Sequence, residues 1–208
     1  RIHSPKAPNI YLSAGIHGDE PAGPLAILEL LHRNILSNRF NWFLLPLLNP
    51  TGFLAGKREN AQGIDLNRDY DARLADEIRA HCNWLEGSRK HFALSVCLHE
   101  DWEASGTYLY EVNHSGRPSG AAQALAAAKP LTGIETAPEM DGHLIEQGII
   151  RPQSDPHEKG IFPEAIHLIK GYTDISITTE TPSSQPLEKR VRAQLEMLDT
   201  LLQHVLID

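Results

Sequence analysis

The sequence predicts an α/β fold, a three-layer sandwich in which helices flank a mixed, largely parallel central sheet. Short apolar segments alternate with longer segments of helical periodicity along the 208 residues, as they do in strand–helix–strand units. Apolar residues make up 41% of the chain and charged residues 22%, a balance that can bury a sizeable core. At roughly 150 residues per domain, we expect one domain over residues 1–208.

The first third of the chain reads as strand, helix, strand. Residues 9–14 are short and apolar and predict a buried strand. Pro21 and Pro24 then lie where a first helical turn tolerates proline. The helix that they begin carries apolar side chains at spacings of three and four, at Leu25, Leu28, Leu31 and Ile35. Residues 40–48 predict the second strand.

The middle of the chain continues this alternation. Residues 73–88 predict a helix with an apolar stripe at Leu74, Ile78, Cys82 and Leu85. Residues 92–98 and 107–112 predict two further strands. The alanine-rich stretch at 121–128 has high intrinsic helix propensity and predicts one helix.

The last third is less regular. Residues 132–171 are rich in Gly, Pro and charge and show no clear period, so we expect long loops over one end of the sheet. Residues 174–179 predict a last strand. Residues 187–206 predict a C-terminal helix with an apolar stripe at Val191, Leu195, Leu198 and Leu202.

Composition excludes several classes of partner. The formal net charge is -8 and the pI is about 5.7, so the surface field opposes binding to nucleic acid or anionic lipid. No apolar run approaches the roughly 18 residues of a membrane span. We therefore expect neither a nucleic-acid nor a membrane partner, and the oligomeric state stays open.

The two cysteines, Cys82 and Cys97, make no disulfide framework and no CxxC motif. They fit a reducing compartment, so we expect a cytoplasmic protein. The first residue is Arg1 rather than Met, which leaves open whether a leader precedes it.

Two histidines follow predicted strands. His17 and Glu20 lie three residues apart on a turn between the first strand and its helix, a spacing that allows both to bind one zinc ion. His99 ends the strand at 92–98, and ligands in open α/β sheets collect outside the carboxyl ends of strands. Two histidines, one glutamate and an open fourth position make a catalytic rather than a structural zinc site. A single histidine is more often structural, and the chain has 11 of them.

An acidic run and a polar loop surround these candidates. We interpret Glu100, Asp101 and Glu103 as a solvated acidic loop. The HExxH motif of another zinc hydrolase class is absent from the sequence.

In the loop at 58–70, Arg68 offers a planar fork for a carboxylate and Asn67 adds an amide donor, so the pair could grip the end of a substrate. The alternative for each arginine is a surface ion pair. Glu180, at the end of the last predicted strand, could exchange a proton with a metal-bound water, although a glutamate there is more often a surface residue.

Taken together, these segments resemble the zinc carboxypeptidase superfamily. That superfamily includes carboxypeptidases of the A and B type, bacterial murein-peptide amidases, and the succinylglutamate desuccinylase and aspartoacylase branch. The five matching segments, in chain order, are residues 17–20 (HGDE), 49–53 (NPTGF), Arg58 together with 63–68 (GIDLNR), 98–99 (LH) and Glu180 in TETP. An ordered set of five that spans most of the chain is far more specific than any one member.

The resemblance implies a role for each matched residue. His17, Glu20 and His99 would bind one zinc ion, and Glu180 would be the general base and acid. The mechanism of such enzymes then follows, because zinc lowers the pKa of its water and the glutamate accepts a proton.

The resemblance also implies that Arg58 polarises the scissile carbonyl and that Asn67 and Arg68 hold the substrate's carboxylate. The loop tyrosine of the pancreatic-type enzymes has no clear counterpart. The side chain or acyl group of the substrate is therefore left open.

Three functions compete. The first is a metallocarboxypeptidase-like amide hydrolase, a metallopeptidase that removes a C-terminal residue from a small peptide or amino-acid conjugate with a free carboxylate. The second is an N-acyl amino acid deacylase of the desuccinylase and aspartoacylase type, which would use the same zinc and the same carboxylate clamp. The third is an inactive module that binds peptide termini, which a complete set of ligands and base disfavours.

Overall fold

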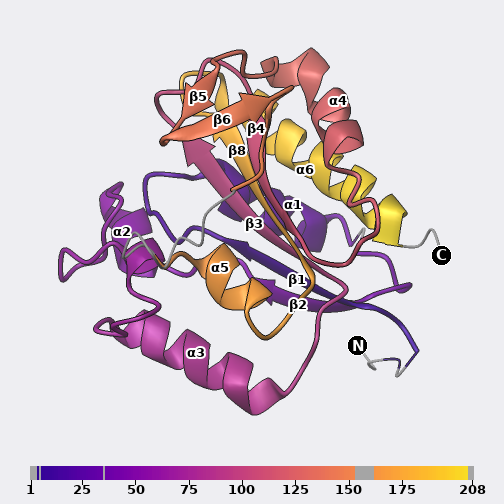
Figure 1. The fold of residues 1–208 in the computed structure, drawn as a ribbon. Helices are drawn as coiled ribbons and strands as arrows, with labels where there is room; N and C mark the ends of the chain where they lie inside the picture. Colours follow the sequence, from indigo (N-terminus) through magenta and orange to yellow (C-terminus); the bar gives the residue numbers. More distant parts are fainter. Residues whose placement is uncertain (1–3, 5, 35, 153–161, 206–208) are drawn as a thin grey trace.

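The computed structural model describes residue 4 and residues 6–34, 36–152 and 162–205. Within these ranges eight strands form one sheet in the order β2-β1-β3-β8-β4-β7-β6-β5 (Figure 1). The strands are β1 (Asn9–Ala14), β2 (Asn41–Leu45), β3 (Leu94–Asp101), β4 (Tyr108–Asn113), β5 (Glu139–Met140), β6 (His143–Glu146), β7 (Ile149–Ile150) and β8 (Ile175–Pro182).

The sheet is mixed. Strands β2, β1, β3 and β8 run parallel, whereas β4 pairs antiparallel with β8. Beyond β4 the sheet continues through a parallel pair with β7 and two antiparallel pairs, β7–β6 and β6–β5. The predicted fold class is confirmed.

Helices cover both faces of the sheet (Figure 1). The α-helices are α1 (Ala22–His32), α2 (Pro50–Ala55), α3 (Asp76–Ser88), α4 (Ala121–Thr132), α5 (Glu164–Ile169) and α6 (Leu187–Val205), and a 3-10 turn, η1, spans Leu66–Arg68. Helices α1, α4 and α6 pack on one face and share the largest core with the strands. Helices α3 and α5 pack on the other face.

Alternation along the strands explains this packing. Side chains of a strand point to opposite faces in turn, so Leu12 enters the core under α1 and α6 while Tyr11 packs against Leu85 of α3 and Leu168 of α5. Because β1, β3 and β8 are parallel, their carboxyl ends meet at one edge of the sheet. That edge carries the candidate site.

The first helix buries a different stripe from the one predicted. Ala26, Ile27 and Leu30 are buried, whereas Leu28 is 59% and Leu31 46% exposed. Small residues set this orientation, because a Cβ added to Gly23 would lie 3.0 to 3.1 Å from side chains of β1 and β3. The helix therefore packs the face with its small side chains on the sheet. The spacing of its leucines does not predict this orientation. Residue 35, the last of the predicted stripe, lies outside the described residues.

Other stripes shift in the same way. Leu74 lies before α3 and is 65% exposed, while the rest of its predicted stripe is buried. On α6, Leu198 is buried as predicted, but the buried face is centred one residue away from the other predicted positions, which are half-buried. Two of the buried side chains on this face, Arg190 and Gln194, are polar.

The segment at 132–171 is not a long loop throughout. It forms the hairpin strands β5, β6 and β7 and the short helix α5. These strands have two to four residues each, too few to show a hydrophobic period in the sequence. Residues 153–161 lie outside the described part of the chain.

Cys82 and Cys97 are both buried free thiols. Among the described residues, no helix is long and apolar enough to cross a membrane.

Candidate metal centre

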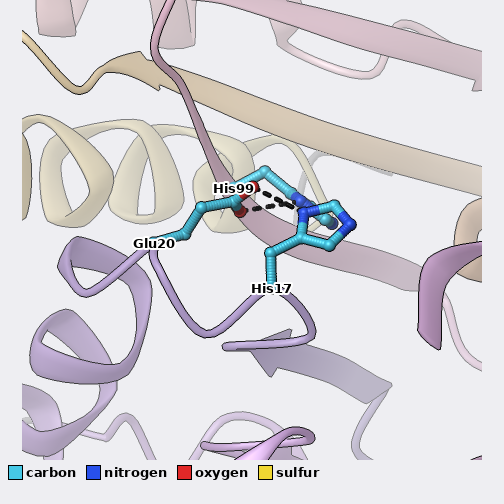
Figure 2. A group of neighbouring side chains, drawn as sticks. All are labelled: His17, Glu20 and His99. Carbon is cyan, nitrogen blue, oxygen red and sulfur yellow. Dashed lines mark hydrogen bonds and ion pairs between the residues drawn. The ribbon is translucent and has the colours of Figure 1, made fainter. Parts of the chain in front are cut away.

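Three buried side chains from neighbouring strand ends face one another (Figure 2). His17 and Glu20 follow β1, and His99 lies near the end of β3. His17 Nδ1 lies 2.5 Å from Glu20 Oε1, and His99 Nδ1 lies 2.9 Å from Glu20 Oε2. One ligand atom from each residue lies within 4.8 Å of the others. The structure thus brings together the three residues that the sequence predicted as metal ligands.

The charges of this cluster favour a bound cation. Burial opposes ionisation of Glu20, but His99 and His17 outweigh it and lower the pKa of the carboxyl to about 2. Burial alone would lower the pKa of each histidine, yet the facing Glu20 carboxylate raises both. Two imidazole nitrogens and one carboxylate are a donor set that zinc accepts. The residues present therefore fit a metal ion.

Asp65 supports His17 from the other side of the ring, a role that the sequence analysis missed. Its Oδ1 lies 3.3 Å from His17 Nε2, and its Oδ2 accepts a hydrogen bond of 2.9 Å from Arg58 Nε. Burial alone would raise the pKa of the Asp65 carboxyl, but the interaction with His17 outweighs it and lowers the pKa. Metal-binding histidines commonly direct their second nitrogen to a carboxylate, so the acid of GIDLNR was a recognisable signal.

Close backbone contacts hold the histidine loop in place. A Cβ on Gly18 would lie 2.0 Å from the carbonyl carbon of Gly52, so only glycine fits beside His17. Asn49 caps α2 by accepting a hydrogen bond of 2.8 Å from Gly52 N. Its Nδ2 donates to the carbonyl of Ile16 at 3.3 Å and to that of Arg58 at 3.1 Å. The matched HGDE and NPTGF segments thus form one packed unit.

Arg58 lies beside the metal ligands. Its Nη1 is 3.3 Å from His17 Nδ1 and 3.9 Å from Glu20 Oε1, and 38% of its side chain is exposed. Asp65 holds the other edge of the guanidinium. A cationic donor that is anchored on one side and open on the other can reach a substrate oxygen bound next to the metal ligands.

Asn67 and Arg68 lie together on η1, but their surroundings differ. Asn67 is buried, and its Oδ1 accepts a hydrogen bond of 2.9 Å from the backbone N of Glu164 at the start of α5. This bond fixes the side-chain orientation and leaves the amide NH₂ as the donor for a ligand. Arg68 is exposed, and its Nη1 donates to the Asn67 carbonyl at 3.0 Å. The turn can therefore present an amide and a guanidinium together.

Glu180 lies directly across from His99. The two residues are partners in the parallel β3–β8 pair, so their side chains leave the sheet on the same face. Burial raises the pKa of the Glu180 carboxyl well above its ordinary value, and the nearby Glu20 adds to this effect while His99 opposes it. Among the described residues Glu180 is not part of the cluster of metal-ligating atoms. It is instead a neighbouring acid that can hold a proton.

The interpretation of the acidic run as solvated is wrong for Glu100. This residue is 5% exposed, and its Oε1 accepts a hydrogen bond of 2.7 Å from the backbone N of Ala22 at the start of α1. Its other oxygen forms a buried ion pair with Arg190. Only Glu103 is fully exposed, whereas Asp101 is half-buried. The alternation of β3 sends Glu100 to the face opposite His99, toward α6.

Comparison with known proteins identifies the family. The family model for the succinylglutamate desuccinylase/aspartoacylase catalytic domain matches residues 6–134, more than half of the chain. A solved structure of a candidate metallopeptidase from Shewanella amazonensis SB2B superposes with a TM-score of 0.81 and 27% identity, covering 96% of this chain and 78% of that one.

Two curated relatives are carboxypeptidases. Carboxypeptidase SOL1 of Arabidopsis thaliana is 32% identical over an alignment of 105 residues that covers 40% of this chain and 21% of that protein. Carboxypeptidase D of Anas platyrhynchos is 27% identical over 201 residues, which cover 70% of this chain and 14% of that protein. The alignments thus span about a fifth or less of the length of these relatives.

The chain belongs to the succinylglutamate desuccinylase/aspartoacylase catalytic-domain family, within the zinc carboxypeptidase superfamily. The resemblance predicted from the five ordered motifs is confirmed. These matches support a hydrolase of the metallopeptidase type.

Proposed function

We propose that residues 1–208 form the catalytic domain of a zinc-dependent amide hydrolase that releases a C-terminal residue from a peptide or amino-acid conjugate. The observation that carries the proposal is the convergence of His17, Glu20 and His99, with Glu180 across the strand pair from His99. The carboxypeptidase relatives support the same reaction class.

His17 Nδ1, His99 Nδ1 and the Glu20 carboxylate would hold the zinc. A zinc ion bound there supplies a Lewis acid that polarises a carbonyl and makes water acidic near pH 7. Asp65 lies beside the second ring nitrogen of His17 and would orient the ring.

Glu180 would accept a proton from the attacking water and return it to the leaving amine. Burial raises the pKa of its carboxyl well above the ordinary value, which suits a group that takes up a proton. Arg58 would donate a hydrogen bond to the carbonyl oxygen as negative charge develops there. The Asn67 amide and the Arg68 guanidinium would hold the free carboxylate of the substrate, which fixes the bond that is cut.

A second candidate is an N-acyl amino acid deacylase. The match to the desuccinylase and aspartoacylase catalytic domain favours it. Both reactions use water to attack an amide whose far side carries a carboxylate, so the same residues serve either one. The two candidate functions therefore differ only in the substrate that is hydrolysed.

The test combines metal analysis with a substrate panel. The purified chain is expected to bind one zinc ion and to hydrolyse peptides with a free C-terminus but not their C-terminal amides. Glu180→Gln is expected to lower kcat by about 10²- to 10⁴-fold while keeping the zinc. Glu103→Gln serves as the control, because this exposed acid lies four residues beyond His99 and outside the cluster.

Full hydrolysis by Glu180→Gln, or a purified chain that excludes zinc, would overturn the catalytic proposal. Turnover of N-succinyl or N-acetyl amino acids without turnover of peptides would overturn the carboxypeptidase and support the deacylase.

A further inference from the structure

One glutamine lies in the apolar face that α6 turns toward the sheet. Gln194 is 0% exposed, and its neighbours on this face include Ala193, Met197 and Leu198 of the main core. A buried amide costs stability unless its hydrogen bonds are made. Core packing alone therefore does not explain why a glutamine occupies this position.

The Gln194 side chain hydrogen-bonds two adjacent strands at once. Its Nε2 donates to the backbone carbonyl of His99 on β3 at 2.8 Å and to Thr181 Oγ1 on β8 at 3.2 Å. Its Oε1 accepts from Thr179 Oγ1 at 2.6 Å. Both ends of the amide are thus used, and every partner lies at the carboxyl ends of β3 and β8.

These partners surround the two residues that the proposed reaction needs most. Thr179 and Thr181 flank Glu180 in the sequence, and alternation along β8 sends them toward α6 while Glu180 points to the opposite face. His99 is the strand partner of Glu180. Gln194 therefore lies on the far side of the sheet, beneath the His99–Glu180 pair, without touching either side chain.

On the side of β1, β3 loses its paired neighbour at this point. The pairing of β3 with β1 ends at Leu98 and Ala14, one residue before His99. The Gln194 amide supplies β3 with a hydrogen bond just beyond that end. Beyond that end, the position of His99 depends on the β3–β8 pairing, on the contacts of the adjacent Glu100 and on Gln194.

We propose that Gln194 is a positioning residue that holds His99 and Glu180 at a fixed separation through the backbone and threonines of the two strand ends. This inference rests on the proposed function for Glu180 and on the metal-ligand role of His99. A shift of about 1 Å at a reacting group can cost roughly 100-fold in rate, so such a support has a large effect.

The test uses Gln194→Met, which keeps the length of the side chain and removes all three hydrogen bonds. Metal affinity is measured on the metal-free full chain by competition with a chelator, using Zn²⁺ and Co²⁺, and the absorption spectrum of the Co²⁺ form reports ligand geometry. We expect metal affinity and kcat each to fall by about 10- to 100-fold, with KM nearly unchanged and an altered Co²⁺ spectrum.

A matched control separates positioning from stability. Met197→Ala removes a buried side chain from the same face of α6, away from the strand ends, and is expected to lower the Tm without changing metal affinity, the Co²⁺ spectrum or kcat. A milder variant, Thr179→Val, removes one donor to Gln194 without changing side-chain shape. It is expected to lower kcat and metal affinity by a smaller factor than Gln194→Met does. It replaces Gln194→Met in the test if that variant does not fold.

Wild-type metal affinity and spectrum in both Gln194→Met and Thr179→Val would overturn the inference. Losses of metal affinity and kcat that are equal in Gln194→Met and Met197→Ala at the same drop in Tm would overturn it as well. If the wild-type chain binds metal but hydrolyses none of the substrates, the proposed function fails, while metal affinity and the Co²⁺ spectrum still decide whether Gln194 positions His99.

Discussion

The two faces of the central sheet differ in chemistry although the same strands build both. Toward α1, α4 and α6, the strands present aliphatic side chains such as Leu12 and Val96. Toward α3 and α5, they present Tyr11, Ser13 and Cys97. Apolar burial stabilises by about 25 cal/mol per Å², whereas buried polar groups must first recover their lost hydration. The first face thus supplies stability, and the second carries the candidate metal ligand His99 together with buried polar groups.

A hydrogen-bonded network lies on the polar face of the sheet. His81 of α3 lies 3.0 Å from the Tyr11 hydroxyl and 2.8 Å from the Tyr70 hydroxyl, and Tyr11 also donates to the buried Glu164 carboxylate. Burial raises the pKa of Glu164. The backbone N of the same Glu164 fixes Asn67, so the network reaches the proposed carboxylate clamp. Hydrogen-bonded partners thus add to the apolar contacts that hold this layer together.

The largest effect on stability is expected where a charge enters the apolar side. Arg190→Met leaves the buried Glu100 carboxylate without its cation, and breaking such a pair typically costs about 3–5 kcal/mol. Urea unfolding measures the change in free energy. Arg192→Met on the exposed side of the same helix is the control, with an expected change within about 0.5 kcal/mol. Equal values for the two variants would contradict the assignment of Glu100 as a buried anchor.

A truncation in the aliphatic layer should affect stability alone. Leu12→Ala is expected to lower the free energy of unfolding by about 3 kcal/mol, because it leaves a cavity between β1 and the helices above it. Zinc content and KM should stay at their wild-type values, since Leu12 points away from the cluster. Leu28→Ala, at an exposed position of α1, provides the reference for a leucine that is not buried. Loss of zinc by folded Leu12→Ala would show that the two faces are not independent.

The polar face should respond to pH where the aliphatic face does not. Burial, aided by the nearby His167, lowers the pKa of His81 to about 3, compared with about 6.5 in an unfolded chain. Protonation therefore favours the unfolded state, so the contribution of neutral His81 is complete above pH 6.5 and declines as the pH falls toward 3. The slope for one histidine is at most about 1.4 kcal/mol per pH unit.

Urea unfolding over this pH range measures that slope. His81→Gln should flatten it, whereas His91→Gln should leave it unchanged, because the side chain of His91 is 60% exposed. An unaltered slope in His81→Gln would assign the acid sensitivity to another group.

The central strands and the convergence of the candidate metal ligands could be predicted from the sequence because each depends on local order. A buried strand must be apolar, and His17 and His99 directly follow such strands. The five motifs, in this order along the chain, predicted the family. The buried stripe of α1 could not be predicted, because small residues rather than leucines approach the sheet there.

The contacts that residues make across the sheet could also not be predicted from the sequence. Glu100 looked like part of a solvated loop, yet it meets Arg190, which follows it by 90 positions. Gln194 lies 95 positions from His99 and resembles any polar residue on a helix. Their roles depend on tertiary pairing that no local spacing encodes. Asp65 is different, since its place in GIDLNR could have been recognised.

The order of the strands has one more consequence. The proposed ligands and base lie at the ends of three adjacent strands, β1, β3 and β8, while the wing of β4, β7, β6 and β5 extends from the far side of β8. Because this wing joins β8 through β4, a change in the length of its hairpin would leave the pairing of β1, β3 and β8 unaltered.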